Sequence, residues 1–127
     1  MAHYSRVYTA VIDVPDADHP AELAFWRGAT GWELPQFEQV PEFHGSRAPH
    51  GHFALLVQHL GEGAPRVHLD FHTSDLEAEA SRLEKLGAVR VERTDRWWIM
   101  RDPAGLPFCV IQDPPGMLDD TNAQRWD

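Results

Sequence analysis

The 127-residue sequence is poor in cysteine, in positive charge and in long apolar runs. Cys109 is its single cysteine, so no disulfide can form within the chain. Only 11 residues are Lys or Arg against 20 Asp or Glu, whereas nucleic-acid binding depends on basic residues that meet phosphates. No apolar stretch has the length of a membrane span, and the first residues lack the features of a secretory signal. We therefore expect a cytoplasmic protein that binds neither nucleic acid nor membrane.

Motifs of several enzyme classes are also missing from the sequence. It contains no Gly-rich phosphate loop, no paired Cys motif and no Ser-His-Asp arrangement of a hydrolase. The stretches "DPAG" and "DPPG" are typical of turns. With 43% hydrophobic and 24% charged residues, the composition is that of a folded protein, and we expect one domain over residues 1–127.

The order of the predicted elements occurs twice along the chain. "RVYTAVIDV" predicts a strand, and "DADHPAELAFWRGATG" predicts a helix with Pro20 in its first turn and Gly31 at its end. "RVHLDFHTS" predicts a second such strand, and its helix has Ser74 and Glu77 at the spacing of a capping box and ends at Gly87.

Further strands are expected after each helix. They are "GWELPQF" and "GHFALLVQHL" in the first half, then "AVRVER", "RWWIMRD" and "LPFCVIQ" in the second. This indicates an internal duplication, with one module at about 6–60 and another at about 66–112. Residues 38–51 are rich in Pro, Gly and His and predict an irregular loop or frayed edge strand. The tail 113–127 is turn-rich and expected on the surface.

The strand that opens the second module has one polar and one apolar face. His68, Asp70 and His72 alternate with an apolar set, which we expect to pack against the helices: Val67, Leu69 and Phe71. The polar set favours the lining of a wet cavity, since burying such groups is costly unless they are paired. Alternatively a metal site is made from His68, Asp70 and His72, in which the two imidazoles converge on one ion and a third ligand comes from another strand. The central histidines could provide it: His44, His50, His52 and His59.

The sequence resembles the vicinal oxygen chelate superfamily, and within it the glyoxalase-like and bleomycin-resistance-like domains. The resemblance lies in the two βαβββ modules, the unit "VHLDF…DLEAEASRLEKLGA" and the ending "WWIMRDPAGLPFCVI". The turn Asp102-Pro103-x-Gly105, with Phe108 after it, is the most specific part. The resemblance implies an α+β fold, with a curved mixed eight-stranded sheet around a cavity and helices on its convex face. It also implies a small-molecule ligand and a homodimer. The superfamily includes glyoxalases, dioxygenases, epimerases, thiol transferases and drug-sequestering proteins, so the fold does not choose a function.

The resemblance also implies where a divalent metal would bind. The four ligand positions of the superfamily fall on Tyr8, Leu55, His68 and Cys109 in this sequence, and only His68 is a typical ligand. Leu55 offers no lone pair, although its strand could be shifted by one residue. We therefore expect no cofactor. The alternative is Zn, Fe, Mn or Ni bound through His68.

Two other residues are candidates for the ligand site. Cys109 faces the cavity if Phe108 and Val110 face the helices; there it either fills space or acts as a nucleophile activated by His68. Trp97 and Trp98 are adjacent, so one of them faces the cavity, where Trp98 would stack on a flat ligand.

Two functions follow from these features. The first is a glyoxalase-like protein that binds a small molecule through Tyr8, Leu55, Trp98 and Cys109 without the inherited metal. The alternative is a metal-dependent lyase, isomerase or dioxygenase that uses His68, with Asp70 or His72 as general base.

Overall fold

A computed structural model describes residues 2–49 and 51–127, and over these residues the chain forms two helices and eight strands. Seven of the strands follow the order β2-β3-β1-β4-β7-β6-β5 in one mixed sheet, and β8 pairs with β1. The predicted α+β class with an eight-stranded mixed sheet is therefore confirmed. The chain divides into two compact units, which we call the α1 unit (Thr9–His68) and the α2 unit (residues up to Tyr8 with Leu69–Asp127).

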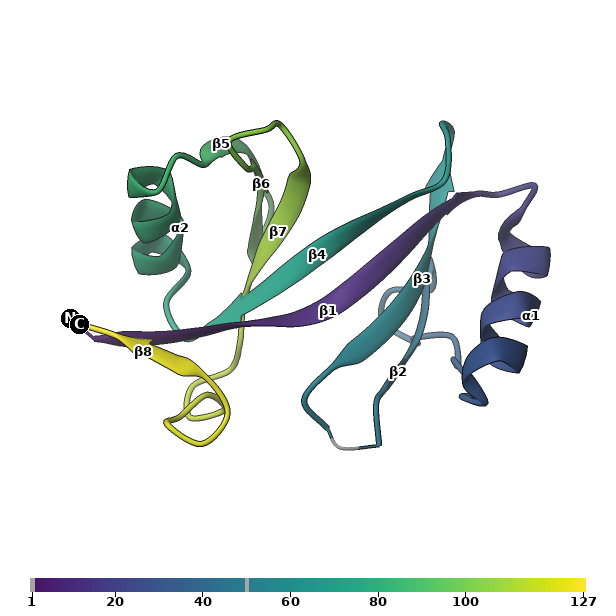
Figure 1. Ribbon diagram of the computed structural model, residues 1–127, viewed down its shortest axis with the longest axis horizontal. Helices are drawn as coiled ribbons and strands as arrows, with labels where there is room; N and C mark the ends of the chain where they lie inside the picture. Colours follow the sequence, from purple (N-terminus) through teal and green to yellow (C-terminus); the bar gives the residue numbers. More distant parts are fainter. Residues whose placement is uncertain (1, 50) are drawn as a thin grey trace. The chain divides into compact units, whose positions relative to one another are not determined.

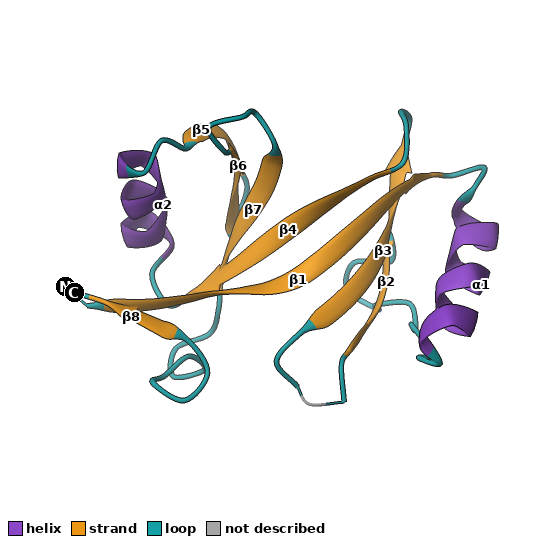
Figure 2. Cartoon of the chain, in the orientation of Figure 1, coloured by secondary structure: helices purple, strands orange, loops and turns teal. Residues whose placement is uncertain are grey.

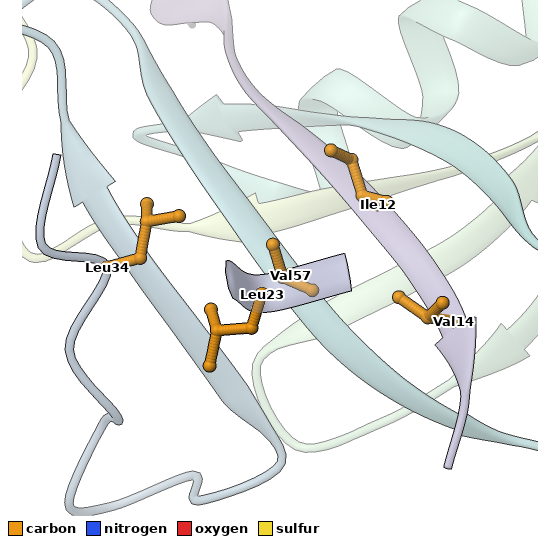
Figure 3. Packing of buried hydrophobic residues seen from close by; sticks show 5 residues of the cluster. All are labelled: Ile12, Val14, Leu23, Leu34 and Val57. Carbon is orange, nitrogen blue, oxygen red and sulfur yellow. The ribbon is translucent and has the colours of Figure 1, made fainter. Parts of the chain in front are cut away.

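Whereas the first module was expected at about residues 6–60, the α1 unit spans Thr9–His68. Its elements are the greater part of β1 (His3–Pro15), α1 (His19–Thr30), β2 (Phe43–Arg47), β3 (Ala54–Gly61) and the start of β4 (Arg66–Thr73). β1 and β3 run parallel, and β2 pairs antiparallel with β3. α1 has a proline in its first turn and ends at Gly31, whose φ of 75° suits glycine. Figure 3 shows the α1 core, which consists of Ile12, Val14, Leu23, Leu34 and Val57.

One strand predicted for this module is absent. The stretch "GWELPQF" is drawn as loop between α1 and β2 in Figure 2, and only Gln36 forms an isolated bridge, to His44. Pro35 explains the difference, because proline cannot donate the hydrogen bond of a strand ladder. Just before it, Leu34 is fully buried at a φ of 48°, a backbone conformation that L residues rarely adopt. Arg27 fixes this bend by donating hydrogen bonds to the carbonyl oxygens of Glu33 and Leu34.

The α2 unit contains most of β4 together with α2 (Leu76–Lys85), β5 (Val89–Arg93), β6 (Trp97–Arg101), β7 (Pro107–Gln112) and β8 (Gln124–Trp126). β4 and β7 run parallel, and β6 pairs antiparallel with both β7 and β5 (Figure 1). The predicted helix stripe is buried in the α2 core, whose members are Leu76, Ala80, Leu83, Met100 and Val110. The tail beyond β7 ends in β8, which pairs with the first residues of β1.

The start of α2 differs from the predicted capping box. Asp75 is the N-cap, and its carboxylate accepts a hydrogen bond from the Ala78 N–H at 3.0 Å. Ser74 instead accepts a hydrogen bond from the Tyr4 N–H at 2.8 Å. The aspartate therefore satisfies the helix terminus, and the serine ties β1 to the end of β4.

The apolar face of β4 is only partly covered, contrary to the prediction. Phe71 packs against the α2 core, but Val67 and Leu69 are 61% and 45% exposed. Within the α2 unit, the main contacts of α2 are with β7, β6 and β5, and Leu69 on β4 stays exposed. None of the described helices is both long and apolar enough to cross a membrane.

Candidate functional site

The candidate site in the α2 unit is a polar face formed by β4 and β7. Asp70 is 6% exposed and pairs in register with Cys109 on the neighbouring strand. The residues on either side of Cys109, Phe108 and Val110, pack with the α2 core. Because side chains alternate along a strand, Asp70 and Cys109 point away from α2, as the alternation of β7 predicts. We call Asp70, His72 and Cys109 the β4–β7 polar face.

His72 is held in place on this face by a carboxylate beyond the end of β7. Its Nδ1 lies 2.7 Å from Oδ1 of Asp113, and the two side chains are 19% and 7% exposed. An ionised carboxylate only accepts, so the imidazole donates its Nδ1–H, and in the neutral imidazole Nε2 is then the lone-pair nitrogen. The Asp113 N–H donates in turn to the Thr73 carbonyl at 2.8 Å, which fixes the carboxylate against the end of β4.

Tyr8 forms the wall beside His72. It is 7% exposed, and its ring meets the imidazole edge-on with centroids 5.2 Å apart. The Arg6 guanidinium lies 4.1 Å from the Tyr8 ring centroid, in a cation–π contact. Tyr8 therefore orients His72 by packing.

His68 is oriented in a similar way within the α1 unit. Its Nδ1 lies 2.6 Å from Oδ2 of Asp13, a carboxylate that is 3% exposed. Arg66 lies 3.8 Å from the same oxygen. The Nδ1–H of His68 is thus donated to a carboxylate, which is how the histidine ligands of metal ions are commonly held.

Among the described residues, His68, Asp70 and Cys109 are a group whose side-chain types could hold a metal ion. Asp70 and Cys109 are register partners in the α2 unit, and His68, the last residue of the α1 unit, precedes Asp70 by two positions on β4. Imidazole nitrogen, carboxylate oxygen and thiolate sulfur are all donors that zinc accepts. His72, the third member of the metal set considered from sequence, is instead bound to Asp113.

The four positions implied by the superfamily do not fit a metal ion. Leu55 has the strand phase of Val57 and packs against the α1 core, so it faces the helix. The adjacent Leu56 has the opposite phase and contacts Gly45. Either register therefore supplies an aliphatic side chain, and Tyr8 packs on His72.

The orientation expected for Trp98 is also corrected. Its register partner is Val110, and Trp98 packs with it against the α2 core. The Arg90 guanidinium lies 4.9 Å from the Trp98 ring centroid on that side. Of the two adjacent tryptophans, Trp97 is therefore the one whose phase matches Cys109.

The sequence reasoning missed the two carboxylates that hold the histidines. Asp13 could have been recognised as a charged residue inside the apolar run "VIDV", which has to find a partner when buried. Asp113 begins the turn "DPPG" directly after β7 and carried no comparable signal.

Comparison with known proteins confirms the predicted membership of the vicinal oxygen chelate superfamily. A family model of the glyoxalase-like domain matches residues 9–111, and the chain belongs to this family. Among curated proteins, none matches the sequence.

Solved structures with the same fold include three enzymes. A methylmalonyl-CoA epimerase from Streptomyces coelicolor, in complex with 2-nitronate-propionyl-CoA, matches with a TM-score of 0.57 and 17% identity, over 87% of this chain and 98% of that one. The methylmalonyl-CoA epimerase from Mycobacterium tuberculosis matches with a TM-score of 0.55 and 17% identity, over 86% of this chain and 88% of that one. An NAD-dependent benzaldehyde dehydrogenase from Legionella pneumophila matches with a TM-score of 0.60 and 9% identity, over 83% of this chain and 99% of that one. At these identities the matches show the shared fold alone.

Proposed function

We propose that this glyoxalase-like domain binds a small organic molecule against the β4–β7 polar face, without the four-position metal site of its superfamily. The observation that carries the proposal is the pairing of His72 with Asp113 beside the buried Asp70. Imidazole and carboxylate groups are costly to bury in an apolar core. Ligand sites, in contrast, typically combine apolar walls with a few fixed polar groups.

The chemistry of the face indicates the kind of ligand. The Nε2 of His72 offers a hydrogen-bond acceptor or a base, and the Asp70 carboxylate offers a second acceptor. Tyr8 supplies an apolar wall next to them. The ligand we propose is a small molecule with hydroxyl, amide or acidic C–H donors. The acyl-CoA ligand of the epimerase of the same fold makes acyl thioesters a first class to test.

The ligand proposal is tested by titrating metal-free protein with a panel of hydroxy acids, acyl thioesters and aromatic carboxylates. Binding is followed by thermal shift and by NMR of the imidazole nitrogens. We expect His72→Ala to weaken binding at least tenfold, and the matched variant of the exposed His52, His52→Ala, to leave it unchanged. If a panel member binds both variants equally, the β4–β7 polar face is not its site.

A metal-dependent lyase, isomerase or dioxygenase is the second candidate, favoured by the donor set His68, Asp70 and Cys109. These residues would hold a zinc-type ion, which would supply Lewis acidity toward a carbonyl oxygen in a lyase or isomerase; a dioxygenase would need a redox-active ion such as iron in its place. Asp13 would fix the His68 ring, and His72 would accept a proton. Elemental analysis of protein purified without chelators separates the candidates. A stoichiometric metal that Cys109→Ser and Asp70→Asn both remove favours the enzyme, and a metal-free protein that binds its ligand favours the first proposal.

We also propose that the protein is cytoplasmic and forms a homodimer. The exposed Val67 and Leu69 support the homodimer, since apolar side chains on a strand face are usual at subunit contacts. Light scattering coupled to gel filtration tests it. We expect the mass of a dimer for the native chain and a monomer for a Val67→Asp, Leu69→Asp double variant.

A further inference from the structure

Three histidines gather in the α1 unit, whereas the β4–β7 polar face belongs to the α2 unit. His19 lies at the start of α1, His44 on β2 and His59 on β3, so three different elements supply them. Ring centroids are 5.0 Å apart for His19 and His44, 6.4 Å for His44 and His59, and 3.5 Å for His19 and His59. A group of imidazoles this close needs an explanation beyond packing.

Two ring nitrogens of this group have no hydrogen-bond partner within the described residues. They are Nε2 of His19, a residue that is only 3% exposed, and Nδ1 of His44. Leaving a buried polar atom unpaired is unfavourable, and most native examples have a partner or a function. The third histidine, His59, is anchored through Nδ1 to Asp16 at 2.9 Å, so its Nε2 remains available as a donor atom.

His19 and His44 have lowered pKa values, which favour the neutral imidazole that binds metal ions. Burial lowers the pKa of His19, and the neighbouring His59 and His44 lower it further, while Asp16 opposes them. Burial also lowers the pKa of His44, with Arg27 and His59 acting in the same direction. Near neutral pH, His19 and His44 thus keep free lone pairs.

We propose that His19, His44 and His59 form a second site, which binds a divalent transition metal of the zinc class. Zinc bonds imidazole nitrogen at about 2.0–2.1 Å, so the ring centroids of two histidines on a tetrahedral ion lie roughly 5 Å apart. His19 and His44 already have that spacing. Asp16 is hydrogen-bonded to Nδ1 of His59, the nitrogen that would not bind the ion. Zinc-bound histidines commonly have a carboxylate partner at this second nitrogen.

Metal binding requires one movement. His19 and His59 lie stacked at an interplanar angle of 12°, so their lone pairs run parallel and do not converge on one point. The His59 side chain is 36% exposed and its partner Asp16 is 66% exposed, so these two hydrogen-bonded side chains are the ones with room to turn together. The bound ion would join the start of α1 to β2 and β3. Its role is structural and does not depend on the function proposed above.

The test uses the full chain and zinc ions alone. Zinc is titrated while the histidine nitrogens are followed by NMR, in parallel with calorimetry and thermal melting. We expect the resonances of His19, His44 and His59 to shift together, a dissociation constant of micromolar or tighter, and a melting temperature that rises with zinc. His59→Ala should weaken this binding at least tenfold. The exposed His52→Ala is the control and should leave it unchanged.

Two results would overturn the proposal. One is zinc binding at His68 and Cys109 with the resonances of the three clustered histidines unmoved. The other is a cluster that responds to acid but not to zinc, because that describes a set of neutral buried rings with no metal role. His44→Gln, which keeps a polar side chain on β2, gives a second variant if His59→Ala does not fold.

Discussion

Replacing Glu79 by Gln should destabilise the protein more than any surface substitution on the same helix. The Glu79 carboxylate on α2 is fully buried. It accepts hydrogen bonds from Nε2 of His3 at 2.9 Å and from Nε and Nη2 of Arg82 at 2.7 and 2.9 Å. The Arg82 guanidinium also lies 3.8 Å from the Trp126 ring centroid. One carboxylate thus connects α2 to the first strand and, through Arg82, to the last.

The expected size of the effect follows from these contacts. Removing one partner of a buried ion pair costs about 3–5 kcal/mol. Glutamine keeps the shape and one acceptor oxygen but turns an N–H group toward His3 or Arg82. We therefore expect a loss of about 3 kcal/mol, which for a domain of this size lowers the melting temperature by about 10 °C.

The pH dependence provides a second check. Burial raises the pKa of the Glu79 carboxyl, but hydrogen bonds from Arg82, His3 and Ser5 outweigh it and hold the pKa below its ordinary 4.5. A depressed carboxyl pKa stabilises the fold above the unfolded-state pKa, and this contribution is lost as the pH falls through the folded-state pKa. The difference between wild type and Glu79→Gln should therefore be full at pH 7 and shrink below about pH 4.5.

Urea unfolding of both proteins from pH 3 to pH 8 measures these effects. The matched control is Glu77→Gln on the same helix, where the carboxylate pairs with Arg90 but its side chain is 70% exposed. Solvent screening should limit that loss to under about 1 kcal/mol. Equal losses for the two variants, or a Glu79→Gln effect that does not change with pH, would refute the reasoning.

Three further predictions concern packing and can be read from denaturant midpoints. Met100→Ala should cost about 2–5 kcal/mol because Met100 is fully buried in the α2 core, whereas Met117→Ala, at a residue 44% exposed, should cost far less. Gly45→Ala should cost about 1–3 kcal/mol, since a Cβ there would lie 2.8 Å from Cγ of Leu56. Gly28→Ala, inside α1 with nothing within 4 Å of the added carbon, should stabilise by about 0.5–1 kcal/mol. The change in the free energy of unfolding should therefore have opposite signs for Gly45→Ala and Gly28→Ala. A loss of stability in Gly28→Ala would contradict the packing described.

The fold was predictable because local and long-range patterns agree. The helix ends at Gly31 and Gly87 and the alternation along β7 are local signals, and each is found in the structure. Two features were not predictable. The loop at "GWELPQF" depends on Pro35 overriding a strand-like composition, and the pairing of β8 with β1 joins segments more than a hundred residues apart.

The candidate site was predictable as a face but not as a set of contacts. Strand periodicity placed His68, Asp70 and His72 on one side of β4, in agreement with their burial. It could not supply Asp13 and Asp113, because hydrogen bonds across 55 and 41 residues leave no trace in local spacing. The exposure of Leu69 could not be predicted either, because the alternation within β4 does not encode which strands α2 covers.

The bend at Leu34 leaves this position without a better residue. Glycine would relax the positive φ, which costs about 1–2 kcal/mol for an L residue, but it would remove a side chain that is fully buried in the α1 core. Any other L side chain of suitable size keeps the unfavourable backbone and fits the space no better than leucine. Efforts to make the protein more thermostable should therefore bypass this site and look to exposed turns, where backbone preference and packing do not compete.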